Sequence, residues 1–145
     1  MPELDIEEVP TGKVYQTTNI GIATFFGGLL VGAYLLSENF KTLGDKRKAT
    51  LTWAIAGLLL VFLIASMFIP ALDRLPKAAY TLLIALLARG AAKHYQEAKI
   101  KAHIQKGGDV YPTKRVIAVT VIGVAILVVF VLVLLIAQDF FTFSK

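Results

Sequence analysis

Residues 116–138, VIAVTVIGVAILVVFVLVLLIAQ, form an unbroken stretch without a charged side chain. A helix of about 20 apolar residues is long enough to cross the roughly 30 Å hydrocarbon core of a bilayer. The many β-branched residues do not indicate a strand, because a strand exposed to lipid would leave its backbone polar groups unpaired. The stretch therefore predicts a transmembrane helix.

The composition of the whole chain agrees with a membrane protein. Of its 145 residues, 57% are hydrophobic and only 17% are charged, and the mean hydropathy is +0.70. These values are too apolar for an ordinary water-soluble domain. Cysteine is absent, which excludes disulfides, thiolate catalysis and cysteine-ligated metal centres.

Three further spans are predicted, at about residues 19–37, 50–70 and 76–92. Pro70 is expected to stop the second span, because proline lacks the N–H that continues a helix. The third is short, and we expect it to cross because long basic side chains near its ends can reach the headgroups; the alternative is a re-entrant or surface helix. Beyond it, the pattern predicts a cytoplasmic helix continuing to about residue 106, where Gly107 and Gly108 supply a C-cap.

The basic residues predict the orientation of these spans. Most Lys and Arg residues lie between spans one and two and between spans three and four. The positive-inside rule puts these loops in the cytoplasm and both termini outside. Residues 1–18 are then an acidic extracytoplasmic tail, and residues 19–145 a four-span membrane domain.

The two pairs of spans share a weak sequence echo. Gly44 and Asp45 follow the first span, Gly108 and Asp109 follow the third, and each pair precedes basic residues and an apolar span with a glycine. This order fits two related helical hairpins of parallel orientation. It fits equally well the ordinary composition of cytoplasmic loops, since Gly-Asp is a common turn dipeptide.

Small residues mark the expected helix-packing faces. Helices in lipid associate largely through close backbone approach at such positions. The expected packing residues are Ala23, Gly27, Gly28, Gly32, Gly57 and Gly123. They fit packing inside a four-helix bundle better than a homodimer seam, because four spans need internal faces first.

The basic rim is the most substantial surface feature of the sequence. Basic side chains near an anionic leaflet attract acidic lipid headgroups. The residues expected to contact them are Lys46, Arg47, Lys48, Arg89, Lys93, Lys114 and Arg115. For Arg89, snorkelling is favoured over pairing with an acid or binding a phosphate. A nucleic-acid role is not expected, because the basic residues are interspersed with apolar ones.

The sequence contains no recognisable catalytic or metal-binding motif. His94 and Glu97 lie one helical turn apart and His103 lies further on, but two ligands do not make a site. We therefore interpret them as solvated helix residues and expect no cofactor, no metal and no catalytic residue. An ionisable group in the middle of a span, the usual mark of a transporter, is not evident.

The run Gly32-Ala-Tyr-Leu-Leu-Ser-Glu-Asn39-Phe-Lys-Thr-Leu-Gly44, with Ile100-Lys-Ala-His-Ile-Gln-Lys-Gly107-Gly108, resembles small uncharacterised bacterial integral membrane proteins with four crossings. The resemblance covers most of residues 20–135 and implies the bacterial inner membrane. It implies no reaction, substrate or cofactor.

Together these patterns predict an all-α, integral membrane four-helix bundle. Its expected role is a non-enzymatic scaffold or accessory subunit of a membrane complex, with membrane lipids and either further copies or other subunits as partners. The alternative is a small homo-oligomeric transporter or channel, suggested by the glycine-rich first span. A membrane-embedded lipid enzyme is a third hypothesis that rests only on polar residues near the basic rim.

Overall fold

The computed structural model describes residues 10–66, 69 and 76–143, with side chains described as far as residue 137. The described chain is helical apart from its connections and two strands of two residues each. This confirms the all-α prediction. The elements are β1 (Lys13–Val14), α1 (Thr17–Thr42), α2 (Lys46–Ser66), α3 (Lys77–Tyr95), α4 (Glu97–Gln105), β2 (Asp109–Val110) and α5 (Thr113–Phe143).

Three of these helices, α1, α2 and α5, are long and apolar enough to cross a membrane by length and composition. α2 and α5 match the second and fourth predicted spans, whereas Pro70, expected to end the second, lies outside the described residues. α3 covers the third predicted span with 19 residues. At 1.5 Å per residue it extends about 28 Å, close to the thickness of the hydrocarbon core.

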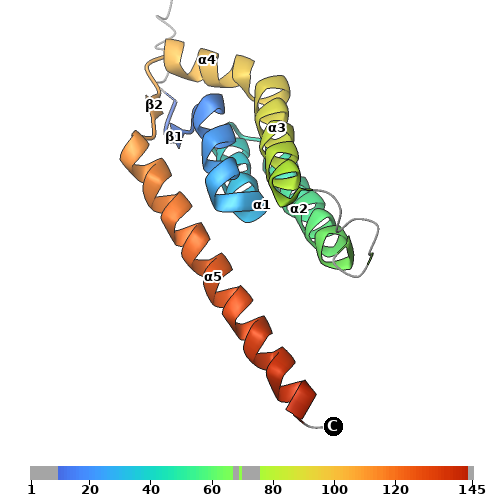
Figure 1. Cartoon of the computed structure of the whole chain (residues 1–145). Helices are drawn as coiled ribbons and strands as arrows, with labels where there is room; N and C mark the ends of the chain where they lie inside the picture. Colours follow the sequence, from blue (N-terminus) through green and yellow to red (C-terminus); the bar gives the residue numbers. More distant parts are fainter. Residues whose placement is uncertain (1–9, 67–68, 70–75, 144–145) are drawn as a thin grey trace, which may run out of the picture.

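α1 is broken at Gly28 and folds back on itself. Gly28 has φ +78° and ψ −170°, which no helical residue adopts. A straight helix of this length would separate Tyr15 from Asn39 by about 36 Å, yet the Tyr15 N–H donates to Asn39 Oδ1 at 2.6 Å. The Thr42 hydroxyl likewise bonds to the Lys13 carbonyl oxygen at 3.3 Å. Residues 17–27 and 29–42 therefore form a hairpin whose two ends lie together (Figure 1).

The hairpin differs from the single straight helix expected over residues 19–37. The start of β1, the start of α2, the end of α3 and the start of α5 all lie at one end of the molecule (Figure 1). We call this the strand end, because it carries β1 and β2. The chain can fold back at Gly28 because glycine lacks the Cβ that disfavours positive φ. The placement of both termini outside the membrane stays a prediction.

The helix after Arg89 also differs from the prediction. Instead of one helix continuing to residue 106, α3 ends at Tyr95 and α4 begins at Glu97. Gln96, with φ −119° and ψ −25°, stands between them, and α4 lies across the strand end (Figure 1). The bend is fixed by the Gln96 side chain, which is fully buried and hydrogen-bonded to α1.

The sequence echo between the two halves has a local explanation. α1 and α4 end in the same turn, with Gly44 at φ +82° and Gly107 at φ +84°. In each, a backbone N–H reaches a carbonyl five residues back: Asp45 to Phe40 at 2.7 Å, and Gly108 to His103 at 2.8 Å. This is the glycine C-cap expected at residues 107–108. The halves otherwise differ, because α1 folds back and α3 does not.

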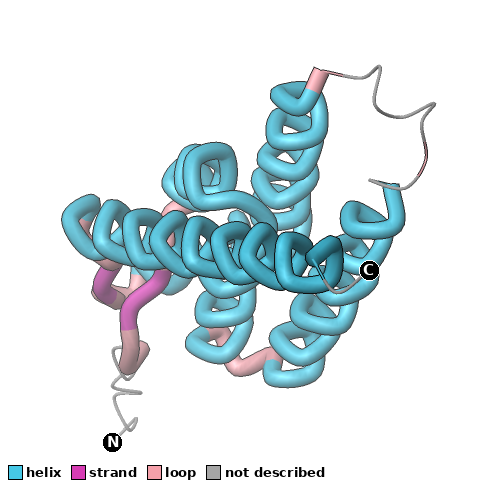
Figure 2. Tube along the Cα trace, turned by 60° about the horizontal axis from the view of Figure 1, so that its bottom comes forward, coloured by secondary structure: helices cyan, strands magenta, loops and turns pink. Residues whose placement is uncertain are grey.

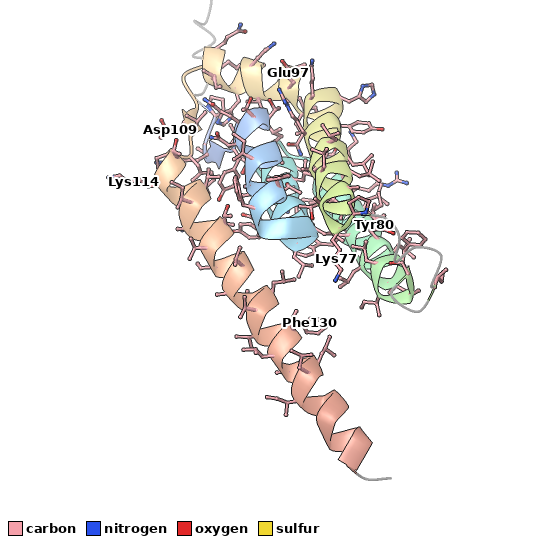
Figure 3. All side chains as sticks on the ribbon, viewed as in Figure 1. Lys77, Tyr80, Glu97, Asp109, Lys114 and Phe130 are labelled. Carbon is pink, nitrogen blue, oxygen red and sulfur yellow. The ribbon has the colours of Figure 1, made fainter. Side chains whose placement is uncertain are left out.

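α1 is the centre of the fold. α2, α3 and α5 each pack against α1 rather than extensively against one another. In the most apolar window of each helix, 61% of α1 is buried, against 17% of α2 and none of α5. The arrangement is thus three helices around a hairpin, not a four-helix bundle with equal members. Beyond the hairpin, α5 continues alone past Phe130 (Figure 3).

Candidate functional site

A buried amide network ties three distant parts of the chain together at the strand end. Asn39 Nδ2 donates to the Tyr15 carbonyl oxygen at 2.8 Å and to Gln96 Oε1 at 3.1 Å. Gln96 Nε2 donates to the Leu36 carbonyl oxygen at 2.9 Å. Both amide side chains are fully buried. Because buried polar groups are stable only when paired, this network fixes the hairpin against the α3–α4 bend.

The two strands extend this network to the start of α5. β1 and β2 pair in parallel, with Lys13 opposite Asp109 and Val14 opposite Val110 (Figure 2). The Tyr111 N–H then donates to the Val14 carbonyl oxygen at 2.9 Å. The N-terminal segment is therefore held between α1 and the connection that leads into α5.

Three tyrosines gather around Arg115 at this point. The Tyr15 and Tyr111 rings stack with centroids 4.3 Å apart, and the Arg115 guanidinium lies 5.9 Å from the Tyr111 ring centroid. The guanidinium also lies close to the Tyr15 and Tyr34 hydroxyls. Burial raises the pKa of Tyr15, an effect that Arg115 partly offsets. The Tyr15 phenol therefore stays neutral in ordinary conditions and can act as a hydrogen-bond donor.

Two apolar grooves open between the helices, each with α1 as its floor. The first, of about 510 Å³, lies between α2 and α3 and has Lys48 and Tyr95 at one end. The second, of about 430 Å³, is lined by α1, α5 and Trp53 of α2, with Tyr34 and Arg115 among its residues. We call them the α2–α3 groove and the α5 groove. In both, a basic side chain adjoins an otherwise apolar wall.

The basic residues of the two grooves differ in their partners. Lys48 Nζ pairs with Asp45 Oδ2 at 2.9 Å, and this pairing lowers the Asp45 pKa. Arg115 has no ion pair with an acidic side chain in the part of the chain that the structure describes. Two acids of the neighbouring elements pair with lysines instead, Glu38 with Lys41 at 2.8 Å and Asp109 with Lys13 at 3.8 Å.

The expected packing residues occupy different environments. Ala23, Gly27 and Gly32 are buried in α1. Gly32 backs onto Thr24, where an added Cβ would lie 2.6 Å from the Thr24 hydroxyl oxygen. Gly123 lets α5 approach the hairpin, since an added Cβ there would overlap the Val31 side chain of α1.

The other two expected packing residues have no close neighbour. A Cβ added at Gly28 or at Gly57 would meet nothing within 4 Å. Gly28 is the hairpin turn, whereas Gly57 lies in the middle of α2. The close approach expected at these positions is therefore absent from the described part of the single chain.

The residues expected to contact acidic headgroups lie toward the strand end, where Figure 3 labels Lys114. Lys48 is half-buried and the remaining members are exposed. Arg89 lays its aliphatic stem against the backbone of Gly21, so that an added Cβ there would lie 3.1 Å from Arg89 Cβ. This packing leaves the charged end free to reach outward, as snorkelling requires. The set is Lys46, Arg47, Lys48, Arg89, Lys93, Lys114 and Arg115.

The interpretation of both histidines as solvated residues is wrong for His103. His94 is exposed, but His103 is only 5% exposed. It packs under the α4 turn, where a side chain at Gly108 would overlap its ring. Within the described residues, no group of three or more His, Asp or Glu side chains is placed to hold a metal ion.

Sequence reasoning missed the amide network and the tyrosine cluster. Asn39 follows an apolar span and Gln96 lies in a polar stretch, so both resemble ordinary interface residues. Asn39 lies 24 residues from Tyr15, and Gln96 lies 57 residues from Asn39 and 60 from Leu36. The fold-back at Gly28 brings Tyr15 to Asn39, and the packing of α3 on α1 brings Gln96 there. No local pattern other than the Gly27-Gly28 pair signals the fold-back.

Comparison of the chain with protein-family models, with curated proteins and with solved structures finds no match.

Proposed function

We propose that the protein is a non-enzymatic integral membrane protein that acts as a scaffold or accessory subunit of a membrane complex. In this proposal α2, α3 and α5 cross the bilayer, and α1 enters it from the strand end and returns. The concentration of basic residues at the strand end supports a cytoplasmic location for that end. The membrane would be the bacterial inner membrane, as the resemblance of the sequence implies.

The break at Gly28 is the observation that carries the scaffold proposal. The second half of α1 spans 14 positions, residues 29–42, so the tip lies about 20 Å from the strand end. At that depth lipid offers no hydrogen-bond partner, and non-helical backbone is stable only when protein covers it or it lines a water-filled cavity. Gly28 is half-buried, with open space where a Cβ would project. A helix from another polypeptide would complete its cover.

The arrangement of the crossing helices supports the same proposal. α2, α3 and α5 pack on α1 rather than on one another. They therefore surround the hairpin but leave space between them beyond its tip. Helix pairs in lipid gain stability from packing rather than from a hydrophobic drive. The open end therefore offers room for helices of a larger complex.

Crosslinking at the hairpin tip tests the scaffold proposal. The chain has no native cysteine, so Phe26→Cys introduces a single thiol at a tip residue that is 67% exposed. Leu58→Cys is a matched control at a comparable depth on α2, where the side chain is 72% exposed. Each variant is treated in native membranes with a thiol-directed photocrosslinker, and the adducts are identified by mass spectrometry.

The scaffold proposal predicts that Phe26→Cys forms a reproducible adduct with one other polypeptide and that Leu58→Cys does not. No protein adduct from Phe26→Cys, or the same adducts from both variants, would contradict it. An adduct at twice the chain mass of 15.8 kDa would favour the second candidate instead.

That second candidate is a small homo-oligomeric transporter or channel. The same break in α1 favours it, because interrupted helices with free backbone groups near the membrane midplane are typical of transport sites. In this case the tips of several copies would surround a shared water-filled path. Purified protein in sealed vesicles would then change the flux of an ion or solute, and a variant that cannot assemble would not.

A further inference from the structure

The α5 groove has the shape and polarity expected of a site for a single lipid molecule. Its wall is apolar from Val119 to Ile126 along α5, with Leu30 and Val31 of α1 opposite. Arg115 and Ile126 both line it. The eleven-residue step between them along the helix corresponds to about 16 Å, comparable with one leaflet of the hydrocarbon core.

The polar end of the groove carries an unneutralised positive charge. Arg115 is near the start of α5, at the strand end, and its guanidinium is flanked by the Tyr34 and Tyr111 side chains rather than by a carboxylate. Arginine binds phosphate through a planar fork of N–H donors, which a lysine does not provide. In the α2–α3 groove, by contrast, Lys48 is already paired with Asp45.

A buried hydroxyl beside Arg115 is also without a hydrogen-bond partner. Tyr15 is 1% exposed, and its hydroxyl has no partner of acceptable geometry within the part of the chain that the structure describes. Leaving such a group unpaired is costly. The guanidinium beside it has no carboxylate partner among the described residues, so this end of the groove suits an anionic oxygen.

We propose that the α5 groove binds one anionic phospholipid, with the phosphate at Arg115 and Tyr34 and one acyl chain along α5 as far as Ile126. Bound there, the lipid would fill the space between the hairpin and α5. It would also add contacts to α5, which packs mainly on α1. The site belongs to one chain, so the proposal does not depend on the scaffold function.

Native mass spectrometry of the intact chain tests this proposal. The protein, freed of its own lipid in detergent, is titrated with phosphatidylglycerol and, separately, with phosphatidylcholine of the same acyl chains. Arg115→Gln removes the proposed phosphate ligand. Lys114→Gln is the matched control, because it removes an equal charge from the adjacent, exposed position of the same helix. Ala118→Trp fills the groove, which Ala118 lines, without changing charge.

We expect the wild type to bind one phosphatidylglycerol about fivefold more tightly than phosphatidylcholine, because the choline cation of the latter offsets the phosphate charge that Arg115 attracts. Arg115→Gln and Ala118→Trp should each weaken phosphatidylglycerol binding about tenfold. Lys114→Gln should weaken it by no more than a single surface charge does, about fivefold. Melting curves of all variants show whether each remains folded.

Equal binding of the two lipids, or equal losses in Arg115→Gln and Lys114→Gln, would overturn the proposal. A third arm distinguishes a lipid from free phosphate as the source of the anion. Inorganic phosphate at the lipid's concentration should neither displace phosphatidylglycerol nor raise the melting temperature. If it does both, the site is a soluble-anion site and the lipid assignment is wrong.

Discussion

Replacing Asn39 with leucine removes the side chain that holds the two ends of the hairpin together. Asparagine and leucine have similar shapes, so the change deletes hydrogen bonds without opening a large cavity. Three bonds disappear: one from the Tyr15 N–H at 2.6 Å, one to the Tyr15 carbonyl oxygen at 2.8 Å and one to Gln96 Oε1 at 3.1 Å. The buried groups of Tyr15 then lack these partners.

The size of the effect follows from those orphaned groups. Each buried group left unpaired costs about 1–3 kcal/mol, and the added apolar burial returns about 1 kcal/mol. We therefore expect Asn39→Leu to lower the free energy of unfolding by about 3 kcal/mol. For a chain of this size, that corresponds to a fall in melting temperature of about 6–12 °C.

The assay is thermal unfolding in detergent, followed by the fluorescence of Trp53, the single tryptophan of the chain. Ser37→Ala is the control. Ser37 lies on the same helix and is 1% exposed, but its hydroxyl has no hydrogen-bond partner within the described residues. Its removal should leave the melting temperature unchanged or raise it. A shift of less than about 2 °C for Asn39→Leu, or an equal fall for Ser37→Ala, would refute the reasoning.

Three further predictions concern the hairpin, its orientation and the buried phenol. Gly28→Ala should lower the free energy of unfolding by about 1–2 kcal/mol, because the Gly28 φ of +78° disfavours a Cβ. Its control is Gly57→Ala, in a regular helix, which should be neutral or stabilising. Equal melting temperatures for the two variants would contradict this prediction. In sealed right-side-out vesicles, an impermeant thiol reagent should label Lys77→Cys but not Thr11→Cys. Labelling of both would instead support four crossings with the N-terminus outside. The raised pKa of Tyr15 means that the folded state holds its proton longer than the unfolded state, so stability should fall as the pH rises above about 10. Tyr15→Phe should reduce that fall, and melting curves across this pH range measure it.

The sequence alone predicted the helical class and the apolar helices long enough to cross a membrane. Both follow from the apolar runs, since no other regular structure satisfies the backbone of a single chain segment in lipid. It also determined the glycine C-cap at the end of α4, because that turn is set by residues adjacent in the chain. The concentration of basic residues around the same connections could likewise be read from the sequence, although their side of the membrane remains a prediction.

The tertiary structure decided how many of the apolar runs pass straight through the fold. The composition of residues 19–37 predicts a membrane span. The Gly27-Gly28 pair within it is compatible with either a packing face or a turn. The choice depends on Asn39 and Tyr15, whose hydrogen bonds form only when α1 folds back. Those bonds join residues far apart in the chain, so no local pattern encodes them. The same contacts bring Arg115 beside the tyrosines, and the proposed lipid site therefore exists only in the folded molecule.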